Sequence, residues 1–422
     1  MVLPEEFLNR MKYLPDFDEF VLSYDKAPES GMRINKRKLK SFSGKMRLGE
    51  RVPWCENGYY ADKSVYSGAH PYHMSGLIYF QEPSAMCAAE LFDMQSGDYV
   101  LDLCAAPGGK STQLADDEDI VLVSNEIIPK RCSVLSENIE RMGYDNVLVT
   151  NESPERLESI FGGFFDKIII DAPCSGEGMF KKEPAAVEAW STEHVKSCSA
   201  RQKKIIDSAM KMLSQGGEIV YSTCTFSHEE NEENAEYITE KYPYMTVVKS
   251  TRIYPHRERG EGHYAVLLKD VRDKVNVQRS VYKQSKASAD CEKLYREFEK
   301  KALNCTLSGD FVMFGENLYL KKKYLPVDKL KIARVGLHLG VCKKGRFEPA
   351  HALARYLRKD DFKNFAEFEC DDINIKKYLH GDVISGDFSG WGAVICDGLT
   401  VGWVKGSGGM LKNHFPKKLR LI

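Results

Sequence analysis

The middle third of the chain alternates short apolar runs with segments of helical periodicity, and this alternation constrains the fold more than any other feature. The apolar runs are rich in β-branched residues and occupy positions 99–104, 120–126, 146–150, 167–171 and 218–222. Such runs, separated by amphipathic helices, are typical of a parallel sheet with helices on both faces. Residues 245–270 add a predicted closing pair of strands. We therefore predict an α/β, Rossmann-like sheet of seven strands, with ligands at the carboxyl ends of the strands.

The composition changes on both sides of this block, so we predict several domains in the 422 residues. Residues 271–300 lack apolar runs, and from about residue 306 short strand-like segments are separated by glycines. The expected parts are an N-terminal segment, an α/β domain, a linker with an intermediate small domain, and a β-rich domain. Their expected boundaries are 1–92, 93–270, 271–345 and 346–422.

The chain has neither an export signal nor a long apolar stretch. Its first residues, MVLPEEFLNRMKYLPDFDEF, carry acids where a signal peptide needs positive charge, and no run of 18 apolar residues occurs. We expect a cytoplasmic protein with no membrane segment. The twelve cysteines are therefore expected to be reduced thiols, and because no CxxC pair occurs we expect no metal site.

The turn after the first predicted strand has the sequence Asp102-Leu-Cys-Ala-Ala-Pro-Gly-Gly-Lys110. It fits neither GxGxxG nor GxxxxGK[ST], which argues against NAD and against a P-loop. Small residues before a helix N-terminus allow close approach of an anionic group, and Glu126, at the end of the second strand, is placed to bind ribose hydroxyls. The pair predicts an adenosine-containing ligand such as S-adenosylmethionine. The alternative is a structural glycine turn beside a solvated acid.

Two further strand ends carry a cysteine each. The fourth strand runs into Asp171-Ala-Pro-Cys174-Ser-Gly and the fifth into Tyr221-Ser-Thr-Cys224-Thr. A thiolate that adds to carbon 6 of cytosine makes carbon 5 nucleophilic enough to accept a methyl group, and a second group is then needed for release. Either cysteine alone is more simply a core thiol. Two at neighbouring ligand-facing strand ends, beside an acid able to bond the cytosine edge, predict cytosine chemistry.

The segments LDLCAAPGGKSTQLA, NEIIPKR, DAPCSGEGMF and YSTCTFSHEENE resemble the motifs of RNA 5-methylcytosine methyltransferases, the Nol1/Nop2/Sun group, over residues 93–270. RFEPAHALA at 346–354 and WVKGSGGMLKNHFPKKLR at 403–420 resemble the bacterial RsmF-type enzymes that methylate 16S rRNA. The resemblance implies an N-terminal RNA-contacting segment and a C-terminal PUA-like domain around the methyltransferase sheet.

The resemblance also implies roles for individual residues. Cys224 would be the nucleophile, Cys174 the thiol that assists product release, and Asp171 the cytosine contact. S-adenosylmethionine would be bound by Cys104, Ala105, Ala106, Pro107, Gly108, Gly109, Lys110, Glu126, Arg131, Ser153 and Asp171. Ser153, with Glu152 beside it, stands where the family usually has an Asp near the adenine amino group. DNA cytosine methyltransferases use the Pro-Cys thiol as nucleophile, so exchanged roles for the two cysteines remain an alternative.

The formal net charge of −1 argues weakly against a nucleic-acid partner, but the charge is segregated. Basic stretches occur at 33–51, 321–346 and 403–422, and we expect RNA phosphate contacts from Lys36, Arg37, Lys38 and Lys412. The acids Glu229, Glu230, Glu232 and Glu233 are expected to form a solvated first helical turn.

The sequence thus predicts an RNA cytosine-C5 methyltransferase that acts on 16S rRNA or the 30S subunit as a monomer. The alternatives are a tRNA methyltransferase of the same chemistry and a non-catalytic RNA-binding assembly factor. A DNA or small-molecule methyltransferase is disfavoured by the basic flanking segments.

Overall fold

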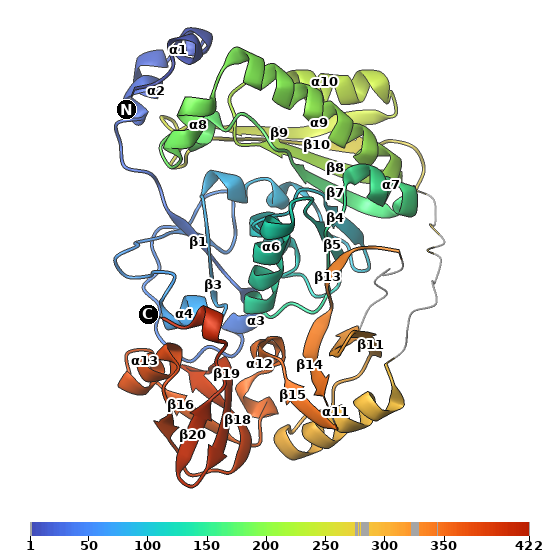
Figure 1. Ribbon diagram of the computed structural model, residues 1–422. Coiled ribbons are helices and arrows are strands. Elements are labelled where there is room, and N and C mark those ends of the chain that lie inside the picture. The colour runs from blue at the N-terminus through green and yellow to red at the C-terminus, as the bar shows by residue number, and fades with distance from the viewer. Residues whose placement is uncertain are drawn as a thin grey trace.

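The computed structural model of the chain describes residues 2–274, 277, 279, 287–321, 329–343 and 345–421. Figure 1 shows a central α/β layer, with the N-terminal helices at one end of the molecule and the C-terminal strands at the other. Within these described ranges, no helix is both long and apolar enough to cross a membrane.

The central sheet has eight strands in the order β13-β6-β5-β4-β7-β8-β10-β9. Five neighbouring strands, β6 to β8 in that order, are parallel, and β10, β9 and β13 are antiparallel additions. The bounds are β4 Tyr99–Asp102, β5 Val121–Asn125, β6 Val147–Thr150, β7 Phe165–Asp171, β8 Leu213–Thr223, β9 Met245–Ile253, β10 His263–Asp270 and β13 Ile332–Val335. The predicted Rossmann-like α/β sheet is confirmed.

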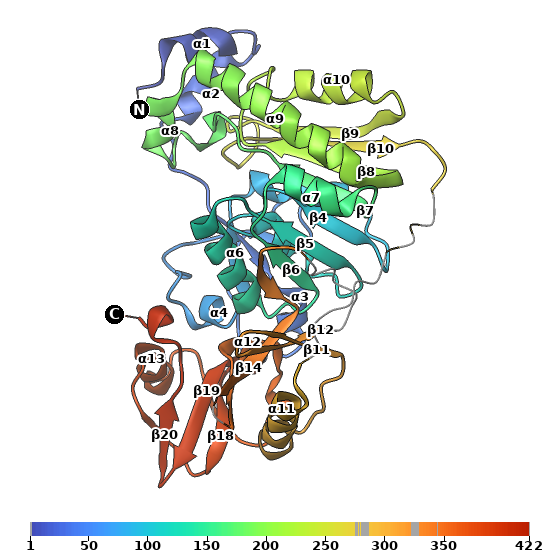
Figure 2. The ribbon, with the colours of Figure 1, turned by 45° about the vertical axis from the view of Figure 1, so that its right-hand side comes forward.

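Helices cover both faces of this sheet, as Figure 2 shows from the side. The helices are α5 Gly109–Leu114, α6 Pro129–Met142, α7 Pro154–Phe161, α8 Pro184–Ala189, α9 Thr192–Met212 and α10 Glu232–Lys241, with the 3-10 turn η3 Glu177–Met179. One apolar core includes side chains of α7, α9 and α10, and the other those of α5 and α6. Proline opens α6, where its missing N–H costs no hydrogen bond, and Gly143 ends it with a φ of 78°.

Strand β13 was not expected from the sequence. It adds to the edge strand β6 from a position about 180 residues later in the chain, with Ile332 opposite Thr150 and Val335 opposite Leu148. Four residues carry too little periodicity to predict a strand, and the pairing depends on how the C-terminal part packs. The sheet therefore joins the methyltransferase-like core to the C-terminal part.

The N-terminal part spans the length of the core. Its elements are α1 Glu5–Met11, α2 Phe17–Ser23, β1 Gly31–Ile34, α3 Lys36–Leu39, β2 Gly58–Tyr60, α4 Pro71–Met74, β3 Ile78–Gln81, η1 Ser84–Met86 and η2 Ala89–Leu91. Phe7 and Phe20 pack with Phe180 and Phe226 of the core. Further along, Ile34 belongs to a cluster that includes C-terminal side chains. The segment thus contacts both the core and the C-terminal part.

The C-terminal part contains two further sheets, with orders β11-β12-β14-β15 and β16-β18-β19-β20-β17. The first comprises β11 Asp310–Phe314, β12 Asn317–Lys321, β14 Leu337–Lys343 and β15 Arg346–Pro349, with α11 Ala289–Ala302 and α12 His351–Tyr356. The second comprises β16 Phe365–Phe368, β17 Ile384–Ser385, β18 Gly390–Cys396, β19 Leu399–Ser407 and β20 Met410–Asn413, with α13 Ile373–His380 and the 3-10 turns η4 Lys359–Asp361 and η5 Lys417–Leu419. The predicted β-rich C-terminal region is confirmed.

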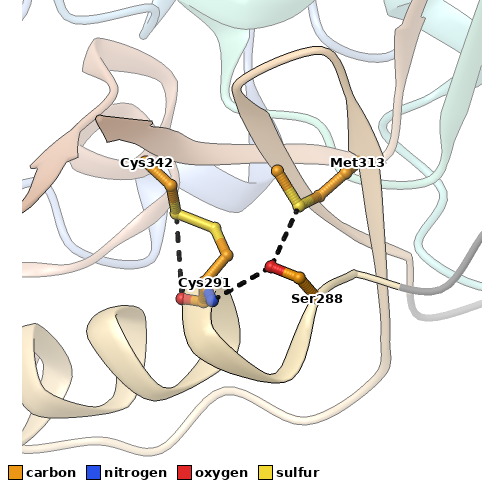
Figure 3. The surroundings of a disulfide bond; sticks show 4 residues. All are labelled: Ser288, Cys291, Met313 and Cys342. Carbon is orange, nitrogen blue, oxygen red and sulfur yellow. Dashed lines mark hydrogen bonds between the residues drawn. A yellow bond between two sulfur atoms is a disulfide. The ribbon is translucent and has the colours of Figure 1, made fainter. Parts of the chain in front are cut away.

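One pair of cysteines departs from the expectation of reduced thiols. Cys291 on α11 and Cys342 on β14 form a disulfide, with their Cα atoms 5.8 Å apart (Figure 3). The expectation was wrong for this pair, because 51 residues separate the two cysteines and their spacing carries no motif. The Ser288 hydroxyl caps this end of α11 by accepting the Cys291 N–H at 3.2 Å. The other ten cysteines are free thiols.

Candidate active site

Two cysteines meet at the carboxyl edge of the central sheet. Strands β7 and β8 are parallel neighbours, with Asp171 opposite Ser222, so the segments that follow them leave the sheet side by side. Cys174 Sγ lies 3.3 Å from Cys224 Sγ, and both residues are partly exposed. The hydrogen bond with Cys224, together with burial, raises the pKa of the Cys174 thiol well above its ordinary value. The two sulfurs therefore share one hydrogen bond, in which either of them can be the donor.

An acid and a lysine stand beside the two thiols. Asp171 Oδ2 lies 2.7 Å from Lys110 Nζ, and Asp171 Oδ1 accepts a hydrogen bond from Ser222 Oγ at 3.0 Å. Burial alone would raise the pKa of Asp171, but Lys110, His263 and the Ser222 hydroxyl together outweigh it and the pKa is lowered. The same pairing raises the pKa of Lys110 against the opposing effect of its burial. The site therefore holds a carboxylate and an ammonium, although the sequence predicted Lys110 only as a cofactor contact.

The glycine-rich turn links β4 to α5 beneath this pair. Gly108 precedes α5 with a φ of 112°, a conformation that side chains with a Cβ rarely adopt. At the end of β4, Asp102 Oδ2 accepts a hydrogen bond from Ser111 Oγ at 2.7 Å. Burial raises the pKa of Asp102 to about 7. The turn from Cys104 to Lys110 thus has the predicted position, at the strand-to-helix junction.

Glu126 follows β5 and is almost completely buried. Its carboxylate accepts the Ile128 N–H at 2.9 Å, and Arg131 Nη1 lies 3.5 Å from the other oxygen. Arg131 Nη2 also donates to the Ala106 carbonyl at 2.7 Å. Arg131 therefore ties the glycine-rich turn to the acid at the next strand end, which brings the predicted cofactor residues from both strands together.

At the strand end of β6, Glu152 and Ser153 each bond a backbone N–H of the chain. Ser153 caps α7, because its hydroxyl accepts the Arg156 N–H at 3.3 Å. Glu152 Oε1 accepts the Lys331 N–H at 2.7 Å. A cavity of about 650 Å³ opens here, lined by Ile127, Pro129, Asn151, Glu152, Ser153, Arg156, Lys329, Leu330 and Lys331. Residues that precede β13 thus form one wall of the space beside the cofactor strand ends.

Four family models together span most of the chain. They are 16S rRNA methyltransferase RsmB/F at residues 89–269, the N-terminal domain of 16S rRNA methyltransferase RsmF at 3–83, the RsmF rRNA methyltransferase first C-terminal domain at 297–357, and the methyltransferase RsmF PUA domain at 365–421. The ribosomal RNA small subunit methyltransferase F of Vibrio cholerae is 31% identical, over 99% of this chain and 97% of the relative. The chain belongs to the RsmF family. The enzyme of the same name from Shewanella piezotolerans is 30% identical over 98% of this chain and 97% of its own length.

Solved structures agree with the RsmF fold. NSun6 from Pyrococcus horikoshii, solved with SFG, has a TM-score of 0.53 and 21% identity, and the match covers 64% of this chain and 99% of that one. A methyltransferase homolog protein from the same organism has a TM-score of 0.51 and 23% identity, covering 64% of this chain and 100% of its own. These likenesses show the fold, and family membership makes the chain an RsmF-type, S-adenosylmethionine-dependent methyltransferase.

Two of the predicted RNA contacts have structural partners inside this RsmF-family chain. Arg37 forms an ion pair with Asp145 at 3.2 Å and donates to the Ala115 carbonyl at 2.5 Å. Lys38 donates to the Arg355 carbonyl, and burial followed by the nearby arginines lowers its pKa to about 7. The prediction that these two residues bind phosphate is not tested by these contacts, which show that both side chains also bond other parts of the chain.

The surroundings of this basic stretch include acids as well as bases. Lys36 is exposed but forms an ion pair with Glu56. Arg37 and Lys38 line a cavity of about 470 Å³ that is also lined by Asp145 and Asp361, so its walls carry both positive and negative charges. The similarly predicted stretch at 321–346 includes residues 322–328 and 344, which lie outside the described residues.

Lys412, in contrast, is exposed on β20, directly opposite the exposed Lys405 of β19. Because directly opposed residues share one face of a sheet, the two ammonium groups form a basic pair on the PUA domain. Lys405 Nζ lies 5.4 Å from the centre of the Trp391 ring, which adds an aromatic surface. The prediction that Lys412 contacts RNA stays a prediction, whereas Trp403 and Phe415, aromatic residues of the same basic stretch, are core residues.

The sequence missed two buried groups near the thiols. His263 Nε2 lies 3.9 Å from Asp171 Oδ1, and burial followed by Lys110 lowers the histidine pKa to about 3. Glu230 is fully buried and lies before α10, so its assignment to a solvated helical turn was wrong. The four-acid run carried no signal that one acid would turn inward. Among the described residues, no group of His, Cys, Asp or Glu side chains forms a metal site.

Proposed function

We propose that this protein methylates carbon 5 of cytosine in 16S rRNA, with S-adenosylmethionine as methyl donor. The observation that carries the proposal is the pair of thiols 3.3 Å apart, beside the carboxylate of Asp171. Two sulfurs at one strand edge supply the nucleophile and the partner that covalent cytosine chemistry requires. A tRNA substrate for the same chemistry is the alternative, and no contact in the structure favours it.

Cys224 acts as the nucleophile in this proposal. Its thiolate forms a bond to carbon 6 of the cytosine, and the ring electrons make carbon 5 nucleophilic. After carbon 5 takes the methyl group, a base removes the proton from carbon 5, the double bond between carbons 5 and 6 reforms, and the carbon–sulfur bond breaks. Asp171 and Lys110 are placed to bond the amino and carbonyl edge of the base, with an acceptor and a donor respectively.

Cys174 assists the last step. Because its raised pKa keeps Cys174 protonated and its sulfur lies 3.3 Å from Cys224, it can donate a hydrogen bond through its S–H group to the thiolate that leaves carbon 6. The choice of Cys224 as the attacking sulfur rests on the resemblance of its Ser-Thr-Cys-Thr segment to the family motif. The exchanged assignment, with Cys174 as nucleophile, is the alternative.

The strand-end residues suit S-adenosylmethionine. The turn from Cys104 to Lys110 would face its methionine part, Glu126 its ribose, and the 650 Å³ cavity at Ile127 and Glu152 its adenine. Glu152 has a second carboxylate oxygen besides the one bound to Lys331, whereas the Ser153 hydroxyl is used as a helix cap. The bound cofactor supplies an electrophilic methyl group, and Arg131 would keep the turn and Glu126 in register.

The flanking parts would handle the RNA. We assign residues 1–92 to an RNA-recognition segment, 93–270 to catalysis, 271–345 to a linker with a small domain and 346–422 to a PUA-like module. The exposed lysines at positions 405 and 412 are the proposed phosphate contacts on that module. We further propose a monomer that acts in the cytoplasm, on the rRNA or on the 30S subunit.

Bisulfite sequencing tests this function. Unmodified 16S rRNA, 30S subunits and tRNA are incubated with the full chain and S-adenosylmethionine, with Cys224→Ala as the control. We expect protected cytosines in 16S rRNA only with the wild-type chain. Protection in tRNA alone would favour the alternative substrate, and no protected cytosine in any RNA would refute the proposal.

A further inference from the structure

The two thiol-bearing segments are joined by a buried polar network that the proposed chemistry does not use. Glu230 Oε2 accepts two hydrogen bonds, from the Ser175 N–H at 3.0 Å and from Gln202 Nε2 at 2.8 Å. Gln202 Nε2 also donates to the Pro173 carbonyl at 3.1 Å. The residues on both sides of Cys174 are therefore held by one acid and one amide.

The same network reaches the segment that carries Cys224. Asn231 Nδ2 donates to the Thr225 carbonyl at 2.9 Å, and Thr223 Oγ1 donates to Asn231 Oδ1 at 2.5 Å. Ser175 Oγ and Thr225 Oγ1 share a hydrogen bond of 2.8 Å that crosses between the two segments. Because Glu230 and Asn231 are adjacent in the chain, one short stretch fixes both cysteines.

The polar side chains of this network are buried, so removing them from water costs free energy and favours the one arrangement in which they bond each other. Glu230, Gln202, Asn231 and Asn234 are all fully buried. Asn234 Nδ2 donates to Gln202 Oε1 at 2.8 Å, which fixes the orientation of that amide. Both donors reach Glu230 Oε2, Oε1 has no hydrogen-bond partner among the described residues, and burial raises the pKa of Glu230 to about 7. Because a buried polar group is costly without its hydrogen bonds, the two bonds to Oε2 restrict the residues that make them. The function of the network in this protein is best explained by the geometry that it imposes on the two segments that carry Cys174 and Cys224.

We propose that Glu230 is a positioning residue for product release: it holds the Pro173–Ser175 segment so that the Cys174 thiol stays against Cys224. The inference rests on the proposed function, because it assumes that the contact between Cys174 and Cys224 assists product release. Glu230 accepts the N–H of Ser175, the residue next to Cys174, and its charge is among the causes that raise the pKa of the Cys174 thiol. Loss of its carboxylate removes the bond to Ser175 and loosens the Cys174 segment, which keeps its bonds to Gln202 and Thr225, whereas the Cys224 segment keeps its bonds to Asn231. Release should therefore suffer more than methyl transfer.

The test separates these two steps in the full-length chain. Single-turnover methyl transfer and the decay of the protein–RNA adduct are measured for the wild type, Glu230→Ala, Glu230→Gln and Glu229→Ala. A lost hydrogen bond to a charged group corresponds to roughly a 10- to 100-fold effect. We expect Glu230→Ala to slow adduct decay by at least about tenfold and methyl transfer by less than about threefold. Glu230→Gln, which keeps an acceptor oxygen, should restore decay to within about threefold of the wild type.

Glu229→Ala is the matched control. Glu229 is the neighbouring acid, but it is partly exposed and bonds Arg10 at 2.9 Å, far from the Cys174 segment in sequence. Its loss should leave adduct decay unchanged. If Glu230→Ala does not fold, Gln202→Met supplies the same test, because it removes the donor to Pro173 and to Glu230.

Three results would overturn the inference: unchanged adduct decay in Glu230→Ala, equal slowing of both steps, or no rescue by Glu230→Gln. A failure of the proposed function looks different. In that case neither the wild type nor Cys174→Ala forms an adduct or methylates RNA. If Cys174→Ala accumulates adduct and Glu230→Ala does not, the function stands and only the role of Glu230 is refuted.

Discussion

The strand-end site and the basic stretch at residues 36–38 are both recognisable in the sequence as motifs of charged or reactive side chains. In the structure, the side chains of the two motifs have different surroundings. At the strand ends, Asp171, Cys174 and Cys224 converge within bonding distance of one another or of Lys110. In the basic stretch, Arg37 and Lys38 turn inward onto backbone carbonyls of other parts of the chain.

The difference has a topological cause. Side chains that follow neighbouring parallel strands must reach the same edge of a sheet, so a motif at each strand end predicts a shared site. A run of lysines and arginines has no such constraint, and its role depends on what packs against it. The comparison therefore predicts separate effects: changes at the strand ends alter chemistry, and changes at residues 37 and 38 alter stability.

The largest expected effect is on chemistry. Cys224→Ala removes the sulfur that bonds carbon 6 and should abolish methyl transfer, as measured by incorporation of labelled methyl groups into 16S rRNA. Its thermal unfolding should stay within a few degrees of the wild type, since the residue is only partly buried. Activity near that of the wild type would contradict the claim that changes at the strand ends alter the chemistry.

The next effect is on stability. Arg37→Ala removes an ion pair and hydrogen bonds that are largely buried, so the free energy of unfolding should fall by about 2–4 kcal/mol. Lys45→Ala, an exposed member of the same basic stretch, should change it by less than about 0.5 kcal/mol. Denaturant unfolding measures both. Full stability of Arg37→Ala together with weaker RNA binding would instead support phosphate binding by this residue.

Strands and turns could be predicted where a short sequence pattern specifies them. The site could be predicted because the parallel sheet brings the motifs at neighbouring strand ends together. Seven strands of the central sheet, the turn at residues 104–110 and the facing cysteines follow from runs of ten residues or fewer. The eighth strand, β13, pairs with a partner about 180 residues away and has no local signature.

The remaining misses share that physical reason. Glu230 is buried because Ser175 and Gln202, 55 and 28 residues away, offer it donors. The disulfide joins cysteines 51 residues apart. Burial of a polar residue depends on partners that are distant in the chain, and periodicity within one segment does not report them.

A third effect concerns pH and the strand end of β4. In the folded chain Asp102 has a pKa of about 7, above that of an unfolded Asp, so the folded state binds the extra proton and wild-type stability falls as pH rises from about 4 to 7. Asp102→Asn removes this ionisation. Between pH 5 and 8 the variant should gain about 2 kcal/mol relative to the wild type. Parallel stability curves in urea would show that burial does not hold Asp102 neutral.

The smallest effect sharpens the contrast between the two basic regions. Replacing Lys405 and Lys412 together by Ala should leave the free energy of unfolding within about 0.5 kcal/mol, because both side chains are exposed. RNA affinity should fall several-fold, and the slope of log K against log salt should lessen by about 1.4–1.8. An unchanged slope would show that this face of the PUA domain does not contact phosphate, whereas Arg37→Ala should leave the slope unaltered.

The most direct measurement addresses the division of work between the two sulfurs. Cys174→Ala is incubated with 16S rRNA and S-adenosylmethionine, the trapped complex is digested with protease and nuclease, and the nucleotide-bearing peptide is identified by mass spectrometry. We predict accumulation of an adduct in which cytosine carbon 6 is bonded to Cys224. The absence of an adduct, or a cytosine attached to any other residue, would contradict the account.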